Sequence, residues 1–477
     1  MLTRLIKKLW NGKIESFVSS EGGMTLPLLA ATFMTVISFV GVSVDIARYQ
    51  LVQSRLSFAL DAAGLAAGST FSTTNLTFEL NKYMQANFPA HYMGAETPLI
   101  QSQVSGDKNV IDLMANTTMP TTFMNVFGIS TMSVEATSQV TRKASGLEIV
   151  MALDNTGSMN SSGKLAALKD ATTSLVNILF GSHETVKDLW IGLVPFSQAV
   201  NIGTSRTDWI DQTHFATLNW GPTSWAGCVD ARETNSRDQV DDPPTVELYK
   251  AYFSPSTDNR PYPYNTWSYI NANKWIIDRS PLTYSNYIDE DLGPNAYCPQ
   301  PLTPMTGSKT TILNGISSME ARGNTHIGLG AIWAWNMISP RWRGLWGGEM
   351  NEKSLPLDYG TKNMNKAVII LTDGENTMSS TIFTAYGYLS DGRLGTTSSS
   401  TAVTRLNTRL SNVCTAMKNK GIYVYTIALG YPGTSTIDLL KSCASAPNYF
   451  FNSPTSSELT TVFNAIADSL SNLRISQ

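Results

Sequence analysis

An uncharged apolar run near the N-terminus constrains this chain more than any other feature. It extends from Gly22 to Val44, which is 23 residues and roughly 35 Å as a helix. A hydrocarbon core is about 30 Å thick, so the run is long enough to cross a membrane. The first twenty residues carry one acid, Glu15, and four basic residues, namely Arg4, Lys7, Lys8 and Lys13. By the positive-inside rule, residues 1–21 are predicted to be a cytoplasmic leader. The bulk of the chain is then expected on the opposite side of the membrane.

Two other interpretations of this run are a cleaved signal peptide and a buried core helix. A signal peptide has an apolar region of about 7–15 residues, which is shorter than residues 22–44. A core helix does not require this length or the basic flank. We therefore favour an uncleaved transmembrane helix at 22–44.

Residues 45–145 are predicted to hold an extended helix followed by a small antiparallel sheet. Apolar residues recur at helical spacing from Leu51 to Ala63, so the helix should continue beyond the membrane. Apolar and polar residues alternate between Thr131 and Thr141, as in a half-buried strand.

From residue 146 to 473 the pattern changes to short apolar runs that alternate with amphipathic segments. The runs include 147–153, 189–196, 366–371 and 421–429, and the helical segments include 164–180 and 458–473. Such alternation predicts a mostly parallel sheet with helices on both faces. A long insertion at about 201–307 is expected to fold as a subdomain, and Ser379–Thr404 is a second, softer insertion.

Composition excludes several function classes. The net charge is −3, so no global basic field is available for nucleic acid. The four histidines form no HExxH motif and the four cysteines form no CxxC motif, which disfavours zinc hydrolase, zinc ribbon and thioredoxin chemistry. The chain also lacks a P-loop and a Rossmann GxGxxG motif.

Oxygen-bearing side chains follow the predicted strands. Asp154, Thr156 and Ser158 stand where a buried strand meets a helix, and Asp373 ends another buried strand. Thr325 precedes a helical segment. The carboxyl ends of parallel strands meet at one edge of a sheet, so these oxygens are expected to converge there. Oxygen donors without imidazole or thiolate suit a small hard cation, Mg²⁺ or Mn²⁺.

Each of these residues also has an ordinary structural interpretation. Asp154 and Thr325 are suitable helix N-caps, and Asp373-Gly374 is a suitable turn. Two acidic groups, Asp241-Asp242 and Asp289–Asp291, are possible Ca²⁺ ligands, although solvated loop acids are the simpler interpretation. The aromatic residues of the insertion suit either a binding surface or a subdomain core; they are Trp225, Tyr262, Tyr264, Trp267 and Trp275.

Residues 147–470 resemble von Willebrand factor A domains. The resemblance is carried by Asp154-x-Thr156-x-Ser158, Thr325 and Thr372-Asp373-Gly374, which look like that family's metal-ion-dependent adhesion site. Many members have Ser where this chain has Thr156, and the hydroxyl is retained. The resemblance implies a doubly wound sheet, with Mg²⁺ held directly or through water by Asp154, Thr156, Ser158, Thr325 and Asp373.

The N-terminal region resembles TadG-like assembly proteins of Flp (tight adherence) pili. Glu21-Gly22-Gly23, Val44–Arg48 and Asp61–Ala66 carry this second resemblance, as do Pro195–Ser197 and Val200–Gly203 in the A domain. Pilin precursors have Glu five residues after the cleavage-site Gly, whereas Gly23 places Leu28 there, so prepilin processing is not expected. In this family the region 45–145 would be a small α+β, pilin-like unit.

Together these patterns predict a non-enzymatic, single-pass protein of the bacterial inner membrane with most of the chain in the periplasm. It would help to assemble or anchor pili, and its Mg²⁺ site would bind an acidic side chain of a pilus or envelope component. The alternatives are an adhesin or sensor unrelated to pili, or a metal-dependent hydrolase. Outside the cytoplasm disulfides are permitted, and the positions of the cysteines suggest the pairs Cys228–Cys298 and Cys414–Cys443.

Overall fold

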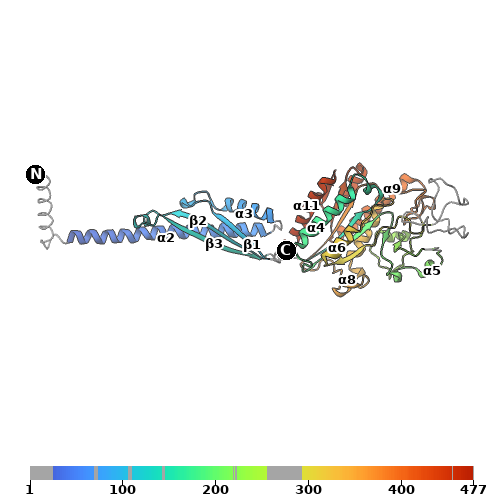
Figure 1. The fold of residues 1–477 in the computed structure, drawn as a ribbon, viewed down its shortest axis with the longest axis horizontal. Coiled ribbons are helices and arrows are strands. Elements are labelled where there is room, and N and C mark those ends of the chain that lie inside the picture. Colours follow the sequence, from blue (N-terminus) through green and yellow to red (C-terminus); the bar gives the residue numbers. More distant parts are fainter. Residues whose placement is uncertain are drawn as a thin grey trace. The chain divides into compact units, whose positions relative to one another are not determined.

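The computed structural model describes residues 25–68, 73–105, 110–141, 146–218, 220, 223–254, 293–453 and 455–475. The chain divides into two compact units, residues 1–142 and 143–477 (Figure 1). Each unit has hydrophobic clusters of its own, so each is described separately. The predicted leader at residues 1–21 lies outside the described residues.

The first unit is organised by one long helix, α2 (Thr25–Gly68). Its N-terminal half is almost entirely exposed and carries large apolar side chains such as Leu29, Phe33 and Phe39. Its C-terminal half buries Val52, Leu56 and other residues at spacings of three and four, the pattern of a helix with one packed face. By length and composition, the stretch from 26 to 66 is able to cross a membrane. The helix continues without a break past residue 45, as far as Gly68.

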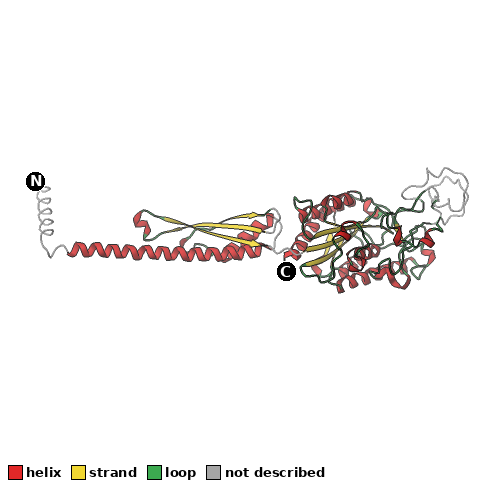
Figure 2. Cartoon of the chain, turned by 90° about the horizontal axis from the view of Figure 1, so that it is seen from below, coloured by secondary structure: helices red, strands yellow, loops and turns green. Residues whose placement is uncertain are grey.

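A three-stranded antiparallel sheet packs on the second half of α2 (Figure 2). Its order is β1 (Leu99–Val104), β2 (Val110–Pro120) and β3 (Thr131–Thr141). On β2 the side chains alternate, so Ile111, Leu113 and Ala115 are buried toward the helices. The unit also contains a helix that the sequence analysis did not predict, α3 (Thr73–Asn87), and two short 3-10 helices, η1 (Tyr92–Gly94) and η2 (Met124–Phe127).

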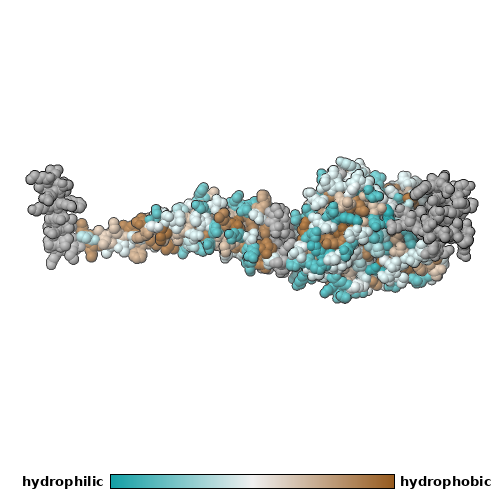
Figure 3. Space-filling view, in the orientation of Figure 1, coloured by the Kyte–Doolittle hydropathy of each residue, from teal (hydrophilic) through white to brown (hydrophobic). Residues whose placement is uncertain are grey.

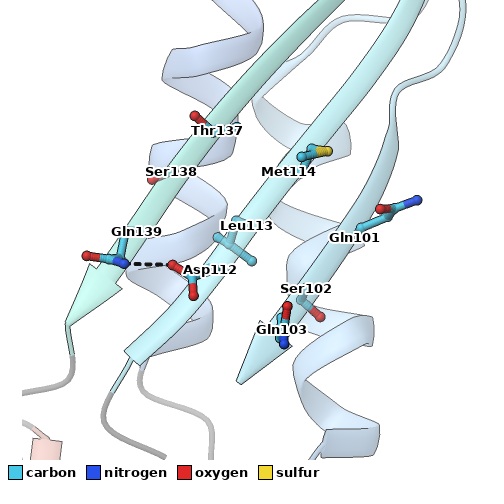
Figure 4. A pocket seen from close by; sticks show the side chains of 9 residues that line it. All are labelled: Gln101, Ser102, Gln103, Asp112, Leu113, Met114, Thr137, Ser138 and Gln139. Atoms are coloured by element: carbon cyan, nitrogen blue, oxygen red, sulfur yellow. Dashed lines mark hydrogen bonds between the residues drawn. The ribbon is translucent and has the colours of Figure 1, made fainter. Parts of the chain in front are cut away.

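The other face of this small sheet is open and mostly polar (Figure 4). Gln101, Asp112, Met114 and Gln139 are exposed there, and Gln139 Nε2 donates a 2.7 Å hydrogen bond to Asp112 Oδ1. The single-sided burial matches the alternation seen between Thr131 and Thr141.

The second unit contains an eight-stranded, mostly parallel sheet, as the sequence predicts. The order is β11-β10-β9-β4-β5-β6-β7, and β8 pairs with β5. The five strands from β11 to β5 run parallel, whereas β6, β7 and β8 pair antiparallel. The bounds are β4 (Gly146–Asp154), β5 (Leu189–Phe196), β6 (Val200–Asn201), β7 (Cys228–Val229), β8 (Thr303–Thr306), β9 (Met364–Thr372), β10 (Tyr423–Leu429) and β11 (Phe450–Ser453).

Helices cover both faces of this sheet. One face packs against α4 (Lys164–Phe180), α6 (Lys309–Ser317) and α11 (Ser456–Ile475). The opposite face packs against α7 (Ile327–Ile338), α9 (Ser399–Asn419) and the end of α10 (Thr434–Cys443). Shorter helices are η3 (Gly157–Asn160), η4 (Thr207–Trp209), α5 (Gln212–Phe215), η5 (Thr234–Gln239), η9 (Pro340–Trp342), α8 (Gly348–Glu352), η10 (Leu389–Asp391) and η11 (Pro447–Tyr449). This is the predicted doubly wound arrangement, with helices on both faces of a mostly parallel sheet.

The described part of the insertion, however, does not form a core of its own. Trp209, Trp225 and Tyr249 belong to the same cluster as the sheet residues Val194 and Phe196. The Trp209 ring lies 5.3 Å from that of Trp342 and 5.2 Å from that of Trp346, measured between centroids. The expectation of a separate subdomain therefore fails for these residues, because their aromatic side chains complete one face of the main core. Tyr262, Tyr264, Trp267 and Trp275 lie outside the described residues.

Both predicted disulfides are confirmed. Cys228 on β7 pairs with Cys298, and Cys414 on α9 pairs with Cys443 at the end of α10. No cysteine is left free.

Candidate functional site

The candidate site lies at the carboxyl ends of β4 and β9. These strands are parallel neighbours, with Leu153 opposite Leu371. Asp154 is the last residue of β4, and Asp373 follows the last residue of β9. The register therefore brings the two carboxylates to the same edge of the sheet, as expected for the ends of adjacent parallel strands.

Asp154 organises the loop that follows β4. Its Oδ1 accepts a 2.8 Å hydrogen bond from the backbone N–H of Thr156, and its Oδ2 accepts a 2.7 Å bond from Thr372 Oγ1. The side chain is fully buried. Burial, together with the nearby Asp373 carboxylate, raises the pKa of Asp154 to about 6.

The two predicted hydroxyls lie between the carboxylates. Thr156 Oγ1 is 3.0 Å from Ser158 Oγ, and Ser158 Oγ donates a 2.5 Å hydrogen bond to Asp373 Oδ1. Thr156 is buried, whereas Ser158 is exposed. The cluster is thus buried at Asp154 and Thr156 and exposed to solvent at Ser158.

Thr325 comes to the same place from the segment before α7. The loop is tied to the Asp154 loop because Gly157 N–H donates a 2.9 Å hydrogen bond to the Gly323 carbonyl. The Thr325 hydroxyl lies close to Gly374 and Ser158. A Cβ added to Gly374 would lie 3.7 Å from Thr325 Oγ1 and 3.8 Å from Ser158 Oγ. All five predicted site residues are therefore brought together at this edge of the sheet.

The structure also distinguishes this arrangement from ordinary caps. Helix η3 has Thr156 at its N-cap position and α4 has Gly163, so Asp154 caps neither. The N-cap position of α7 is His326, not Thr325. The N-cap interpretation of Asp154 and Thr325 is therefore wrong.

One residue of the site was not found from the sequence. Lys164, the first residue of α4, donates a 2.7 Å hydrogen bond from Nζ to Asp373 Oδ2 and forms an ion pair with it. The signal available in the sequence was a basic residue that opens the helix after the Asp154–Ser158 loop. Its ammonium shows that a positive charge is accommodated beside Asp373.

The donor set fits a small hard cation. Two carboxylates and three hydroxyls supply oxygen alone, which is the chemistry that Mg²⁺ and Mn²⁺ prefer. Within the described ranges, no group of three or more His, Cys, Asp and Glu side chains is placed to hold a metal. A metal at Asp154 and Asp373 would therefore depend on the hydroxyls and on water to complete its coordination.

The other acidic groups do not form a second site in the described residues. Asp241 accepts hydrogen bonds from Ser339 and Arg341, and Asp242 forms ion pairs with Arg237 and Arg341. These contacts account for both carboxylates as structural ion pairs. Asp289–Asp291 lies outside the described residues.

One protein-family model matches a stretch of the N-terminal region. Residues 22–70 match the family described as putative Flp pilus-assembly TadE/G-like. The match contains the whole of α2, which includes the apolar run and the extended helix. No curated protein matches the chain.

Several solved structures are similar to parts of the chain. The vWF domain of the type V pili tip protein Mfa5 from Porphyromonas gingivalis is 12% identical, with 69% of this chain and 95% of that chain covered and a TM-score of 0.35. The pilus adhesin SpaC from Lactobacillus rhamnosus GG is 11% identical, with coverages of 78% and 33% and a TM-score of 0.34. Proximal thread matrix protein 1 from the mussel byssus, with a zinc-occupied MIDAS motif, is 13% identical, with coverages of 70% and 47% and a TM-score of 0.31. This chain thus spans about half the length of the mussel protein.

Proposed function

We propose that this chain is a membrane-anchored envelope protein that helps to assemble or anchor Flp/Tad-type pili, and that its A domain binds an acidic protein ligand through Mg²⁺. The observation that carries the proposal is the convergence of Asp154, Thr156, Ser158, Thr325 and Asp373 at one sheet edge. The pilus context is supported by the TadE/G-like match at residues 22–70. The anchor is supported by the one helix in the described chain that is long and apolar enough to span a membrane.

The residues of the site divide into metal-holding and positioning groups. Asp154, Thr156, Ser158, Thr325 and Asp373 would hold Mg²⁺, directly or through water. A bound Mg²⁺ would supply an electrophilic position that a carboxylate from another protein can complete. Thr372 orients Asp154 through its hydroxyl, and the open Ser158 side gives the ligand its approach.

The arrangement favours binding over catalysis. A hydrolase needs a positioned general base or nucleophile next to the metal. His326, which directly follows Thr325, is fully buried. Its ring lies 5.6 Å from the ring of Tyr386, measured between centroids. The hydroxyls of Thr156 and Ser158 contact each other, and the carboxylate that accepts from Ser158, Asp373, is already paired with Lys164 and assigned here to the metal. We therefore propose a non-enzymatic role.

We further propose a single-pass topology in the bacterial inner membrane, with the N-terminus in the cytoplasm and the A domain in the periplasm. The basic residues before the apolar run support this orientation. The two disulfides support an oxidising compartment for the second unit.

Metal-dependent stability of the purified full-length protein tests the site. A ligand that binds the native state alone stabilises it by roughly 2.7 kcal/mol when its concentration is 100 times its Kd. Mg²⁺ should therefore raise the thermal midpoint of the wild type in detergent, and Asp154→Ala or Asp373→Ala should abolish the shift. Asp170→Ala, which removes an exposed carboxylate elsewhere on α4, should leave the shift unchanged.

The cellular role is tested with the same variants. Deletion of the gene should reduce pilus production or surface attachment, wild type should restore it, and membrane-bound Asp154→Ala should not. Full rescue by Asp154→Ala would remove the proposed role of the site. Normal pili with reduced attachment would favour an adhesin or sensor, and an ester or phosphate hydrolysis lost with Asp154→Ala would favour a hydrolase.

A further inference from the structure

The connection between β2 and β3 presents an apolar tip, which we define as residues Phe123–Ile129. Its seven residues contain no charge. The exposed fractions are 40% for Phe123, 82% for Val126, 59% for Phe127 and 45% for Ile129. Four large apolar side chains exposed on one short loop need a partner that removes them from water.

The tip lies along the apolar half of α2. Met124, Phe127 and Ile129 line a shallow groove whose other wall consists of Met34, Thr35, Ser38, Phe39 and Val42. The Phe123 ring lies on Gly41, where an added Cβ would come within 2.6 Å of the ring. In the surface view, hydrophobic colour extends along this end of α2 and the neighbouring hairpin (Figure 3). The tip thus continues the surface of the segment that is suited to a membrane.

A buried polar contact, here called the Asp45 lock, holds the tip in this place. The Asp45 carboxylate accepts hydrogen bonds from the backbone N–H groups of Thr122, Phe123 and Met124, at 2.7–3.1 Å. Arg48 bonds Asp45 Oδ1 and also donates a 2.7 Å hydrogen bond to Thr122 Oγ1. Asp45 is the first charged residue after the apolar run, so the lock lies at the boundary between charged and uncharged chain.

Backbone N–H groups of the tip have hydrogen-bond partners inside the protein and do not depend on water for them. The N–H groups of Val126, Gly128 and Ile129 donate to carbonyls within the tip, in addition to the two that Asp45 accepts. In a bilayer, backbone polar groups must find such partners inside the protein. The groove wall is similarly satisfied, because Thr35 and Ser38 donate to the carbonyls of Ala31 and Met34 on their own helix.

We infer that the tip inserts into the same bilayer that α2 spans, in the leaflet next to Asp45. The inference rests on the proposed membrane anchor. An acyl chain needs no hydrogen-bond partner, and the groove side chains of Thr35 and Ser38 have already used their donors. The uncharged run is about 35 Å long and a hydrocarbon core is about 30 Å, so the last turns of the run lie near the interface. The tip would penetrate on the order of 5–10 Å, with the Asp45 lock at headgroup level.

Depth-dependent fluorescence quenching tests this insertion. Since all four native cysteines are paired, Val126→Cys provides one reactive thiol for an environment-sensitive nitrobenzoxadiazole label. The full-length protein is reconstituted into phosphatidylcholine–phosphatidylglycerol vesicles that contain lipids brominated at a shallow or a deep acyl position. Phe39→Cys, in the apolar half of α2, is the membrane control. Gln101→Cys, on the exposed face of β1, is the aqueous control.

The label at Val126 should emit at shorter wavelength than the label at Gln101, and brominated lipid should quench it several-fold more strongly. Shallow bromine should quench Val126 more than deep bromine does. An aqueous spectrum at Val126 with normal quenching at Phe39 would overturn the inference and leave the anchor intact. A short-wavelength spectrum without quenching would mean that protein covers the tip, which also overturns it. An aqueous spectrum at both positions would reject the anchor and the insertion together.

Discussion

At the scale of single residues, one arginine in the second unit, Arg393, forms ion pairs with two acidic side chains. Arg393 pairs with Asp230 at 2.8 Å and with Glu233 at 2.8 Å. Asp230 is the more buried, and its Oδ1 has no hydrogen-bond partner among the described residues. Burial raises the pKa of Asp230 to about 7, while hydrogen bonds from Arg393 lower that of Glu233. One guanidinium therefore keeps Glu233 ionised and leaves Asp230 protonated at mildly acid pH.

This cluster makes stability depend on pH. Because the pKa of Asp230 is higher in the folded than in the unfolded chain, the folded state binds more protons between about pH 4 and pH 7. Stability should therefore fall as the pH rises through that window, by on the order of 4 kcal/mol at most. Asp230→Asn keeps the shape and should flatten this part of the curve, measured as the thermal midpoint from pH 4.5 to 8. Asp170→Asn is the exposed control, and an unchanged slope in Asp230→Asn would contradict the prediction.

At the scale of elements, the least predictable part of the second unit is the pair α9 and α10. Neither helix was predicted from the sequence. The start of α9 lies in the Ser/Thr-rich stretch 379–404, although Leu406, Leu410 and Val413 follow helical spacing. The structure buries one side of α9, including Leu406 and Leu410, under the sheet. The Cys414–Cys443 disulfide then ties α9 to α10.

Removal of this disulfide should destabilise the second unit. The two cysteines are 29 positions apart, and the chain-entropy model gives about 3.5 kcal/mol for a loop of that length. The variant Cys414→Ala/Cys443→Ala should therefore unfold at lower denaturant concentration than wild type. Wild type kept under oxidising conditions is the reference, and the corresponding Cys228→Ala/Cys298→Ala variant tests the other pair. A midpoint equal to that of wild type would show that packing of α9 and α10 suffices without the bond.

At the scale of the whole molecule, the chain combines two units whose cores differ in kind. The first has a core between one helix pair and one face of a small sheet. The second buries both faces of its sheet. The candidate metal site belongs entirely to the second unit, whereas the apolar helix and the TadE/G-like match belong to the first. The anchoring and ligand-binding roles that we propose are thus separate in the chain.

The proposed topology predicts how a protease reaches the chain in cells. With the outer membrane permeabilised and the inner membrane intact, added protease should degrade the second unit and spare a cytoplasmic marker protein. A short N-terminal fragment should remain with the membrane, because the bilayer protects the apolar helix. Degradation that requires lysis of the inner membrane would place the second unit in the cytoplasm and contradict the topology.

Elements whose patterns are local could be predicted from the order of the amino acids alone. The bounds predicted for 164–180 and 189–196 are those of α4 and β5, since uninterrupted periodicity defines both. The sequence also predicted the convergence of the site residues that follow β4 and β9, because the carboxyl ends of parallel strands meet at one edge of the sheet. Thr325 was predicted to join them from its place before a helical segment.

Features that depend on contacts between residues distant in sequence could not be predicted and became visible in the folded chain. These are the ion pair of Lys164 with Asp373, the packing of the insertion's tryptophans into the main core, and the contact of the β2–β3 tip with α2. The physical reason is the same in each case. A single amino acid type or a short apolar run is compatible with many partners, and folding selects one of them. Asp45 contacts Thr122, 77 positions away, and Lys164 contacts Asp373, 209 positions away.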